Sequence, residues 1–441
     1  MIYDSFIFFN ELDLLELRLR ELESVVDRFV VVEAPVTFAG RPKPLLFGEN
    51  RDLFKRWDSK IIHIIVNDMP TGPDPWQRER HQRNAIRRGL TQAKPDDGVI
   101  VSDADEIPSA QAIRQWQPRM GVHRFEQMFC YYWLNCVAGT WTGSRILPFS
   151  FLEEYSDIDA IRRLECPVLR DGGWHFSFLG RTEAIRAKLE AYSHQDLNLP
   201  TYKEHRYLSQ VTSLGLDLFS REGMTFRFCE VNEKFPTPVQ KNPERYSPFI
   251  CQARFEEDWY PPQQLIRLAS LFEKVRSFAG TVLEIGCWEG RSTVALAHAC
   301  HPETLWAIDT WMGNEDEDVN HPTVLLARSR DVFGRFRVNI SALTGGNVHP
   351  IRQNCHAVLQ DWSAPIKFAH IDASHDYNSM RRAMEAVLRL LVPGGIICGS
   401  DFLTASADRG DLDGGVERAV RELLPGFESS FNLWWWSKLE R

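Results

Sequence analysis

The chain has 441 residues, of which 44% are hydrophobic and 25% are charged. This length predicts two or three domains, and this composition excludes a chain dominated by disorder. The formal net charge of -9 excludes the strongly basic balance that is typical of proteins that wrap nucleic acid.

Strands and helices alternate in the first half of the chain. Runs of apolar and β-branched residues predict strands at 2–9, 29–33, 61–66 and 99–101. Apolar residues at helical spacing predict a helix at 12–22, and a charged helix is predicted at 76–90. This alternation predicts a mostly parallel sheet that binds ligands at the carboxyl ends of its strands.

Prolines accumulate between residues 235 and 262. Repeated prolines block regular helix and sheet and favour extended connections. We therefore expect one domain at 1–240, a proline-rich linker at 241–263 and a second domain at 264–441.

The second half of the chain repeats the alternating pattern more regularly. Predicted strands are 282–285, 305–309, 348–352, 367–372 and 396–398, with a β-rich end at 434–436. Predicted helices are 291–299, 331–343, 377–391 and 416–424. Pro393-Gly394-Gly395 is expected to form a turn that connects the third helix to the strand at 396–398. The pattern predicts a doubly wound α/β sheet.

A glycine-containing turn follows the first of these strands. At Gly286 and Gly290 the backbone can approach a ligand closely, because no side chain obstructs it. Asp309 ends the next strand, where a carboxylate can accept hydrogen bonds from ribose hydroxyls.

The runs "EIGCWEGRST", "HIDASH" and "PGGIICGSDF" together resemble Rossmann-like methyltransferases, and the first run is most similar to their family 24. The resemblance covers essentially all of the chain after Thr281. It implies a seven-stranded class I methyltransferase domain with S-adenosylmethionine as cofactor. The cofactor-binding residues that it implies are Glu284, Gly286, Gly290, Ser292 and Asp309, with Asn354 at the adenine end.

Two interpretations are open for the substrate side of this domain. His375 could act as a general base on a substrate hydroxyl, an effect worth roughly 100- to 10,000-fold in rate. Alternatively, Asp372 and Asp401 could hold Mg²⁺, which would polarise or orient the hydroxyl. The strand that leads to Asp401 ends in a single acid, so it stays open whether the methyltransferase domain requires a metal. Asp372 is a candidate site residue in both interpretations.

In the first domain, "SDADEIP" directly follows an apolar strand. Asp103 and Asp105 are separated by one small residue, so both carboxylates can reach one hard cation, Mn²⁺ or Mg²⁺. A metal held in this way can also bind the diphosphate of a sugar nucleotide and neutralise its charge as it leaves.

Five runs in matching order, "IYDSFIFFNELDLLELRLREL", "VVVEAPVTFAGRPKPL", "QRNAI", "SDADEIP" and "GGWHFS", resemble glycosyltransferase family 17. The resemblance extends from the start of the chain to about Lys234. It implies a GT-A-like fold, an inverting transfer from a UDP-sugar to a glycan or polysaccharide, and a divalent metal. N-acetylglucosamine is the sugar that the known family type transfers.

The resemblance also implies roles for individual residues. Asn10, Glu11 and Glu33 would line the nucleotide pocket, and Arg83 and Asn84 would contact phosphates or sugar. Asp103 and Asp105 would face the metal, with His175 as a third ligand. The base for the acceptor hydroxyl would be Glu106, Asp171 or Glu183.

The 9 cysteines form no CxxC pair, which is typical of reduced thiols in the cytosol. The first ten residues lack the features of a signal peptide, and charges interrupt every apolar run before the ~20 residues that span a bilayer. We therefore expect a cytoplasmic protein with no membrane span, unlike the membrane-anchored animal members of the family. The oligomeric state is left open.

The leading hypothesis is a bifunctional enzyme that adds a sugar and O-methylates a sugar hydroxyl. The alternative is a single-activity O-methyltransferase whose first domain only binds glycan. A nicotinamide oxidoreductase is disfavoured, because the turn at Gly286 lacks the third glycine of the dinucleotide fingerprint.

Overall fold

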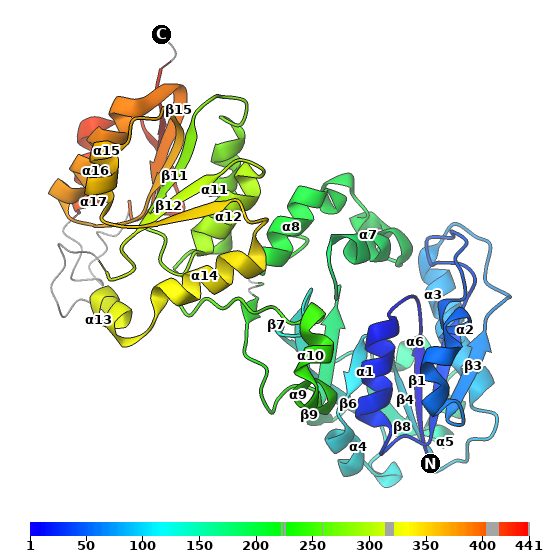
Figure 1. The fold of residues 1–441 in the computed structure, drawn as a ribbon. Coiled ribbons are helices and arrows are strands. Elements are labelled where there is room, and N and C mark those ends of the chain that lie inside the picture. The colour runs from blue at the N-terminus through cyan, green and yellow to red at the C-terminus, as the bar shows by residue number, and fades with distance from the viewer. Residues whose placement is uncertain (222–223, 225, 258, 314–321, 403–413, 440–441) are drawn as a thin grey trace. The chain divides into compact units, whose positions relative to one another are not determined.

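The structure is a computed structural model that describes residues 1–221, 224, 226–257, 259–313, 322–402 and 414–439. The chain divides into two compact units, Met1–Leu208 with Asp217–Cys251 and Ser209–Leu216 with Gln252–Arg441. Figure 1 labels the helices and strands of both units. Among the described residues, no helix is both long enough and apolar enough to cross a membrane.

The first unit is built on a ten-stranded sheet. Its strands are β1 (Ile2–Ile7), β2 (Arg28–Glu33), β3 (Ile61–Ile65), β4 (Gly98–Asp103), β5 (Glu106–Pro108), β6 (His123–Tyr131), β7 (Cys136–Trp141), β8 (Arg145–Pro148), β9 (Val168–Ser177) and β10 (Arg227–Phe228). The main path is β10-β7-β6-β8-β4-β1-β2-β3, and β9 pairs with β5 and β6. Because β1 to β4 are parallel, their carboxyl ends share one edge of the sheet.

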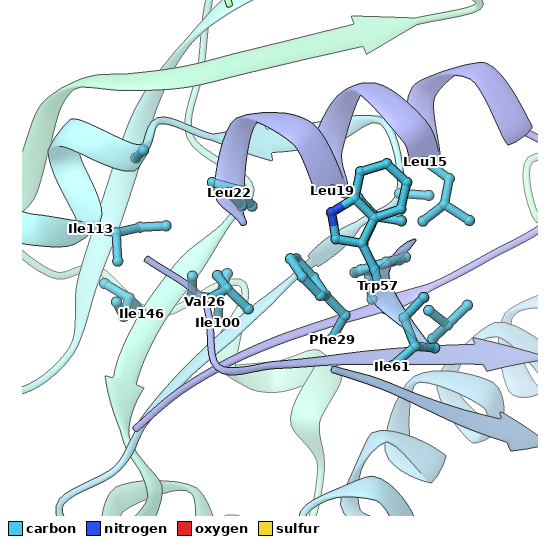
Figure 2. Close-up of a cluster of buried hydrophobic side chains, with 14 of the residues drawn as sticks. Leu15, Leu19, Leu22, Val26, Phe29, Trp57, Ile61, Ile100, Ile113 and Ile146 are labelled. Carbon is cyan, nitrogen blue, oxygen red and sulfur yellow. The ribbon is translucent and has the colours of Figure 1, made fainter. Parts of the chain in front are cut away.

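Helices cover this sheet. They are α1 (Leu12–Leu22), α2 (Leu46–Glu49), α3 (Pro75–Asn84), α4 (Ala110–Gln115), α5 (Phe149–Glu153), α6 (Ile158–Ile161), α7 (Thr182–Ala191), α9 (Thr237–Lys241) and α10 (Pro243–Tyr246); α8 (His205–Leu214) contains residues of both units. Figure 2 shows Leu15, Leu19 and Leu22 of α1 beside Phe29 and Ile61 of the sheet. Each such buried side chain contributes about 1.5–3 kcal/mol relative to exposure, so the helical spacing of α1 fixes it on the sheet.

The predicted charged helix is shorter in the structure. α3 ends at Asn84, and Ala85–Gly89 continues as a 3-10 helix. At Gly89 a Cβ would collide with the side chain of Val30 in β2, so the chain approaches the sheet too closely there for a larger residue. Tertiary packing of this kind is not visible in the local pattern.

The second unit contains a seven-stranded sheet. Its strands are β11 (Thr281–Ile285), β12 (Leu305–Asp309), β13 (Val348–Arg352), β14 (Ile366–Ile371), β15 (Leu391–Gly399), β16 (Glu428–Ser430) and β17 (Leu433–Ser437). Its helices are α11 (Pro262–Glu273), α12 (Arg291–Cys300), α13 (Pro322–Ser329), α14 (Val332–Leu343), α15 (Cys355–Asp361), α16 (Tyr377–Leu390) and α17 (Gly415–Leu423). The order is β13-β12-β11-β14-β15-β17-β16, in which the first five strands are parallel and β17 is antiparallel to both neighbours.

This order confirms the predicted doubly wound sheet, and the two α/β units confirm the predicted fold class. One local prediction is wrong. Pro393-Gly394-Gly395 lies within β15 instead of forming a separate turn. The reason is that Gly394 and Gly395 exchange backbone hydrogen bonds with Lys438, which extends the ladder past the proline.

Candidate active sites

The turn between β4 and β5 carries the two aspartates predicted to face a metal. Asp103 ends β4, and its two carboxylate oxygens are held by guanidinium groups. Arg83 Nη1 lies 2.5 Å from Oδ1 and Arg162 Nη1 lies 2.6 Å from Oδ2. Burial opposes ionisation, but Arg162 and Arg83 hold the pKa of Asp103 well below its usual value. Asp103 is therefore a carboxylate at neutral pH.

Asp105 is held by Lys188 and His175. Lys188 Nζ of α7 lies 2.6 Å from Oδ2, and His175 Nε2 of β9 lies 3.6 Å from the same oxygen. Burial again opposes ionisation, but Lys188 and then His175 keep the pKa of Asp105 far below its usual range. Burial also opposes the charge of Lys188, yet Asp105, Glu11 and Asp103 raise the pKa of this lysine. The ammonium group thus lies in the combined field of three carboxylates.

Glu106, one of the predicted bases, is 1% exposed. Its Oε1 accepts hydrogen bonds from Trp141 Nε1 at 2.6 Å and Arg162 Nη2 at 2.5 Å. Its Oε2 accepts from the Asp103 backbone N–H and from Ser144 Oγ, both at 3.0 Å. With two donors on each oxygen, Glu106 holds the aspartate turn in place and is poorly arranged to take a proton from a substrate.

The other two predicted bases are open to solvent. Asp171 lies in β9 with a left-handed φ of 48° and an exposed side chain. Glu183 lies in the first turn of α7, and its side chain is 74% exposed. Either carboxylate is accessible to a substrate.

The residues predicted for the nucleotide pocket lie at the ends of β1, β2 and α3, where they form hydrogen bonds within the protein. Glu11 Oε2 accepts backbone hydrogen bonds from Phe9 and Asn10, at 3.2 and 3.0 Å. Glu33 is fully buried and its Oε2 lies 3.2 Å from His63 Nε2. Asn84 accepts a backbone hydrogen bond through Oδ1 at 2.7 Å.

The carboxylate oxygens of the aspartate turn are held by protein cations. Arg83 and Arg162 pair with the two oxygens of Asp103, and Lys188 pairs with Oδ2 of Asp105. Over the described residues, no three His, Cys, Asp or Glu side chains converge as a complete ligand set. The ring of His175 stacks on Phe129 with centroids 4.9 Å apart. This arrangement does not fit a metal ion held by the two aspartates, although carboxylate oxygens are donors that such an ion prefers.

The second site begins at the glycine turn after β11. Gly286 and Gly290 have φ of 84° and 89°, in the left-handed region that favours glycine. A Cβ at Gly286 would overlap the carbonyl oxygen of Asp372. Gly290 is the N-cap of α12, so free backbone N–H groups of that helix begin at the turn.

Asp309, at the end of β12, holds this turn. Its Oδ2 accepts from the backbone N–H groups of Cys287 and Trp288, at 2.7 and 2.9 Å, and its Oδ1 accepts from that of Trp311 at 2.6 Å. Burial raises the pKa of Asp309 above its usual value. The carboxylate shapes the turn and lines the adjacent cavity.

That cavity has a volume of about 690 Å³, in the range of small-molecule sites. The predicted residues that line it are Gly286, Ser292, Asp309, Asn354, Asp372, His375 and Asp401. Glu284 is placed differently, because its side chain is fully buried with Oε1 3.3 Å from His370 Nδ1. The ends of separate strands thus assemble one pocket, as expected for parallel strands.

Asp372 lies at the polar end of the cavity. Tyr260 donates its hydroxyl to Oδ2 at 2.6 Å, and the Ser400 hydroxyl donates to Oδ1. Burial and then the charge of Asp401 raise the pKa of Asp372.

Asp401 forms a dyad with His375, whose Nε2 lies 3.0 Å from Oδ2, and Asn432 donates to Oδ1 at 3.3 Å. Burial alone would raise the pKa of Asp401, but His375 lowers it overall. All four carboxylate oxygens of Asp372 and Asp401 therefore accept hydrogen bonds from protein donors. This arrangement does not fit a metal held by the two aspartates, and it fits an oriented histidine base.

A further wall of the cavity comes from a segment just before α11, which we call the wall segment (252–257 and 259–261). Its lining residues are Phe255, Glu257, Trp259, Tyr260 and Pro261. Buried Asn339 fixes it by accepting from Arg254 N and donating to Arg254 O and Glu289 O, each at 2.8 Å. Glu289 Oε2 accepts from Glu256 N at 2.6 Å, which ties the wall segment to the glycine turn.

Sequence reasoning missed Arg162, Lys188 and Tyr260 as site residues. Each lies far along the chain from its carboxylate partner and belongs to no recognisable motif. Tyr260 had one usable indication, because it directly precedes Pro261-Pro262 at a predicted domain boundary.

Comparisons with known proteins follow the same division. Residues 1–246 match glycosyltransferase family 17, and residues 283–402 match a methyltransferase domain. Both resemblances inferred from the sequence are thereby confirmed.

Two curated relatives are β-1,4-mannosyl-glycoprotein 4-β-N-acetylglucosaminyltransferases. The Rattus norvegicus protein is 26% identical over an alignment of 246 residues, and the match covers 46% of this chain and 45% of the relative. The Homo sapiens protein is 30% identical over an alignment of 138 residues, and the match covers 28% of this chain and 26% of the relative. The matched part therefore spans less than half the length of either relative.

Solved structures of methyltransferases are also similar. The O-methyltransferase NovP is 15% identical, with 40% of this chain and 80% of that chain covered and a TM-score of 0.33. CalS11, a TDP-rhamnose 3'-O-methyltransferase of calicheamicin biosynthesis, is 14% identical, with coverages of 48% and 97% and a TM-score of 0.29.

Proposed function

Because the chain belongs to glycosyltransferase family 17 through residues 1–246 and carries a methyltransferase domain at residues 283–402, we propose that it is a bifunctional glycan-modifying enzyme. One unit transfers a sugar from a UDP-sugar to a glycan or polysaccharide acceptor, and the other O-methylates a sugar hydroxyl with S-adenosylmethionine. The observation that carries the proposal is that the motif residues of both units lie at the carboxyl ends of parallel strands, and in the second unit they line a cavity.

For sugar transfer, we propose that the aspartate turn with Asp103 and Asp105 faces the donor diphosphate; the divalent metal that the family resemblance implies would supply charge neutralisation to the leaving group there. Asn10, Glu11 and Asn84 would surround the nucleotide, whereas Glu33 and Arg83 are buried and would act by holding the strand ends in place. Glu106 positions the turn through its four donors, which leaves Asp171 and Glu183 as the accessible acids for the acceptor hydroxyl. N-acetylglucosamine is the donor sugar to test first, because the curated relatives are named for its transfer.

For methyl transfer, we propose that Gly286, Gly290 and Ser292 bind the amino-acid part of S-adenosylmethionine, Asp309 its ribose and Asn354 its adenine end. The cofactor supplies an electrophilic methyl group on sulfur. Asp401 accepts the Nε2 proton of His375, so Nδ1 of this ring is the nitrogen that takes the proton of the acceptor hydroxyl. Methyl transfer by this route requires no metal ion.

We propose that the enzyme works in a reducing compartment, namely the cytoplasm, because its nine cysteines include no CxxC pair.

Incubation of the full chain with UDP-N-acetylglucosamine, Mn²⁺, labelled S-adenosylmethionine and an oligosaccharide panel tests the proposal. We expect one product to gain both a sugar and a methyl group. Methylation without sugar transfer from any UDP-sugar would instead favour a single-activity O-methyltransferase whose first unit only binds glycan. Chelation of metal during the assay tests the divalent metal that the family resemblance implies for sugar transfer, and it should leave methyl transfer intact.

A further inference from the structure

Two tryptophans lie side by side at the wall of the cavity in the second unit, and the methyl-transfer proposal uses neither. Trp259 belongs to the wall segment and Trp288 to the glycine turn after β11, and both line the cavity. Their ring centroids lie 5.3 Å apart, with 38° between the ring planes. Trp259 is 49% exposed. A large aromatic side chain that lines a cavity and stays half exposed is available to a ligand.

The backbone of Trp288 is held in a costly conformation. Its φ of 46° lies in the left-handed region, which is unfavourable for a residue with a Cβ. Its N–H donates to Asp309 Oδ2 at 2.9 Å, its carbonyl accepts from Trp311 Nε1 at 2.8 Å, and its Nε1 donates to Glu257 Oε2 at 3.0 Å. Strain of this kind persists where surrounding contacts impose it, and it clusters at ligand sites. The protein thus fixes the indole of Trp288 beside Trp259.

The chain next to Trp259 leads to the residues proposed for methyl transfer. Tyr260 follows Trp259 directly and donates its hydroxyl to Asp372 at 2.6 Å. The charge of Asp401, the partner of His375, raises the pKa of Asp372, so these acids lie close together. The tryptophan pair (Trp259 and Trp288) is therefore on the acceptor side of the cavity.

The chemistry of the tryptophan pair matches one face of a pyranose ring. The axial C–H bonds of the sugar form an apolar face with a slight positive charge, and the face of an indole is negative. Glu257, Ser374 and Asn432 line the same cavity and offer polar side chains to the sugar hydroxyls. The sulfonium of the cofactor is a poorer match to Trp288, because the Arg330 guanidinium already lies 5.8 Å from the centroid of its ring.

We propose that Trp259 and Trp288 form a sugar subsite, on which a pyranose ring of the acceptor stacks and presents its hydroxyl to His375. The proposal rests on the proposed methylation of a sugar hydroxyl. Its consequence is that the wall segment, which lies outside both family matches, selects the acceptor.

The test measures S-adenosylhomocysteine formation by the full chain at saturating S-adenosylmethionine. The acceptors are catechol and the oligosaccharide panel, including mannotriose and chitotriose. For the oligosaccharide that the wild type methylates, Trp259→Ala should raise the KM by at least about tenfold, because the stacked face is lost. Trp259→Phe keeps an aromatic face and should stay within about threefold of the wild-type KM. Both variants should bind S-adenosylhomocysteine within about twofold of the wild type in calorimetry.

Trp436→Ala is the matched control. Trp436 lies in β17, is partly buried and donates its Nε1 to the Pro425 carbonyl at 3.1 Å, and it does not line the cavity. This variant should lower the melting midpoint and keep the wild-type KM for the oligosaccharide, so a rise in KM is separated from a loss of stability.

The outcomes distinguish the subsite from the activity on which it rests. Methylation of an oligosaccharide with the same KM in the wild type and in Trp259→Ala overturns the sugar subsite and leaves methyl transfer to sugars standing. An equal rise in KM in Trp436→Ala, or a loss of S-adenosylhomocysteine affinity that matches the rise in KM of Trp259→Ala, overturns the subsite as well. Wild-type methylation of catechol alone, or of no acceptor, overturns the proposed methylation of sugars itself.

Discussion

His375 and Asp401 are the residues on which methyl transfer depends most directly. If His375 is the base, His375→Gln should lower the rate of S-adenosylhomocysteine formation by roughly 100- to 10,000-fold. The affinity for S-adenosylhomocysteine, measured by calorimetry, should stay within about twofold, because this histidine faces the acceptor.

The matched control for this variant is His349→Gln, at an exposed position of β13. It should leave both the rate and the affinity unchanged. A His375→Gln enzyme that keeps its rate but loses activity on metal chelation would contradict the base assignment and restore the metal interpretation for Asp372 and Asp401.

Asp372 provides a test through the pH dependence of stability. Burial and then Asp401 raise its folded-state pKa, so its ionised form destabilises the fold. The loss of unfolding free energy that this ionised carboxylate causes is absent at pH values below the unfolded-state pKa of Asp372, about 3.9. It is fully present at pH values above the raised folded-state pKa. Asp372→Asn should therefore raise the melting midpoint at pH 8 by about 2–4 °C, with a smaller gain at pH 4.5.

The amide in Asp372→Asn can still accept from Tyr260 and can donate to the Ser400 oxygen, so the hydrogen-bond pattern is largely kept. Asp361→Asn, at an exposed position of α15, serves as the control and should shift neither midpoint. A lower midpoint for Asp372→Asn at pH 8, or a gain that does not change with pH, would show that the buried charge is not the cause.

At the same scale, local motifs predicted some residues and not others. Asp103, Asp105, Gly286 and Asp309 follow predicted strands directly, so chain position alone places them at the ligand edge of a sheet. The side chain of Lys188 reaches Asp105 across 83 positions of sequence. Such a contact depends on how helices pack over the sheet, which one sequence does not specify.

At the scale of elements, the wall segment has no regular secondary structure before α11, and tertiary hydrogen bonds hold its conformation. Asn339 makes two hydrogen bonds to the Arg254 backbone of this segment and one to the Glu289 carbonyl, and it does not line the cavity itself. Asn339→Ala should destabilise the unit by about 1–3 kcal/mol, because buried backbone groups lose their partner. It should also weaken S-adenosylhomocysteine binding by about tenfold, since the wall loses its position.

Asn347→Ala is the matched control at this scale. Asn347 donates to the carbonyls of Ala297 and Glu303, both at 3.0 Å, away from the cavity. It should lower the unfolding free energy in denaturant titrations without changing the affinity. Equal losses of affinity in the two variants would mean that Asn339 acts only through general stability.

Elements differ in how well the sequence predicts them. The parallel strands β11, β12 and β14 are buried, so their apolar runs are unambiguous. The prolines around residues 248–262 predict an irregular connection, and composition does not say what such a connection contacts. In the structure its last part packs on Asn339 and lines the cavity.

At the scale of the whole molecule, the proposal is that one chain serves two transfers on one glycan. Joining two units raises the local concentration of a shared substrate, to millimolar levels for short flexible linkers. The sequence predicted both fold classes because each unit repeats the strand-helix alternation with motifs at strand ends. The substrates could not be predicted, because they depend on side chains that distant segments bring together.

The central claim is tested most directly by mass spectrometry of the glycan products of three full-length proteins. The wild type should add one sugar and one methyl group to the same oligosaccharide. Asp105→Asn should lose the sugar and still methylate an acceptor that already carries it, and His375→Gln should add the sugar and lose the methyl group. Loss of both modifications in either single variant, or their absence in the wild type across all UDP-sugars, would contradict two independent sites in one chain.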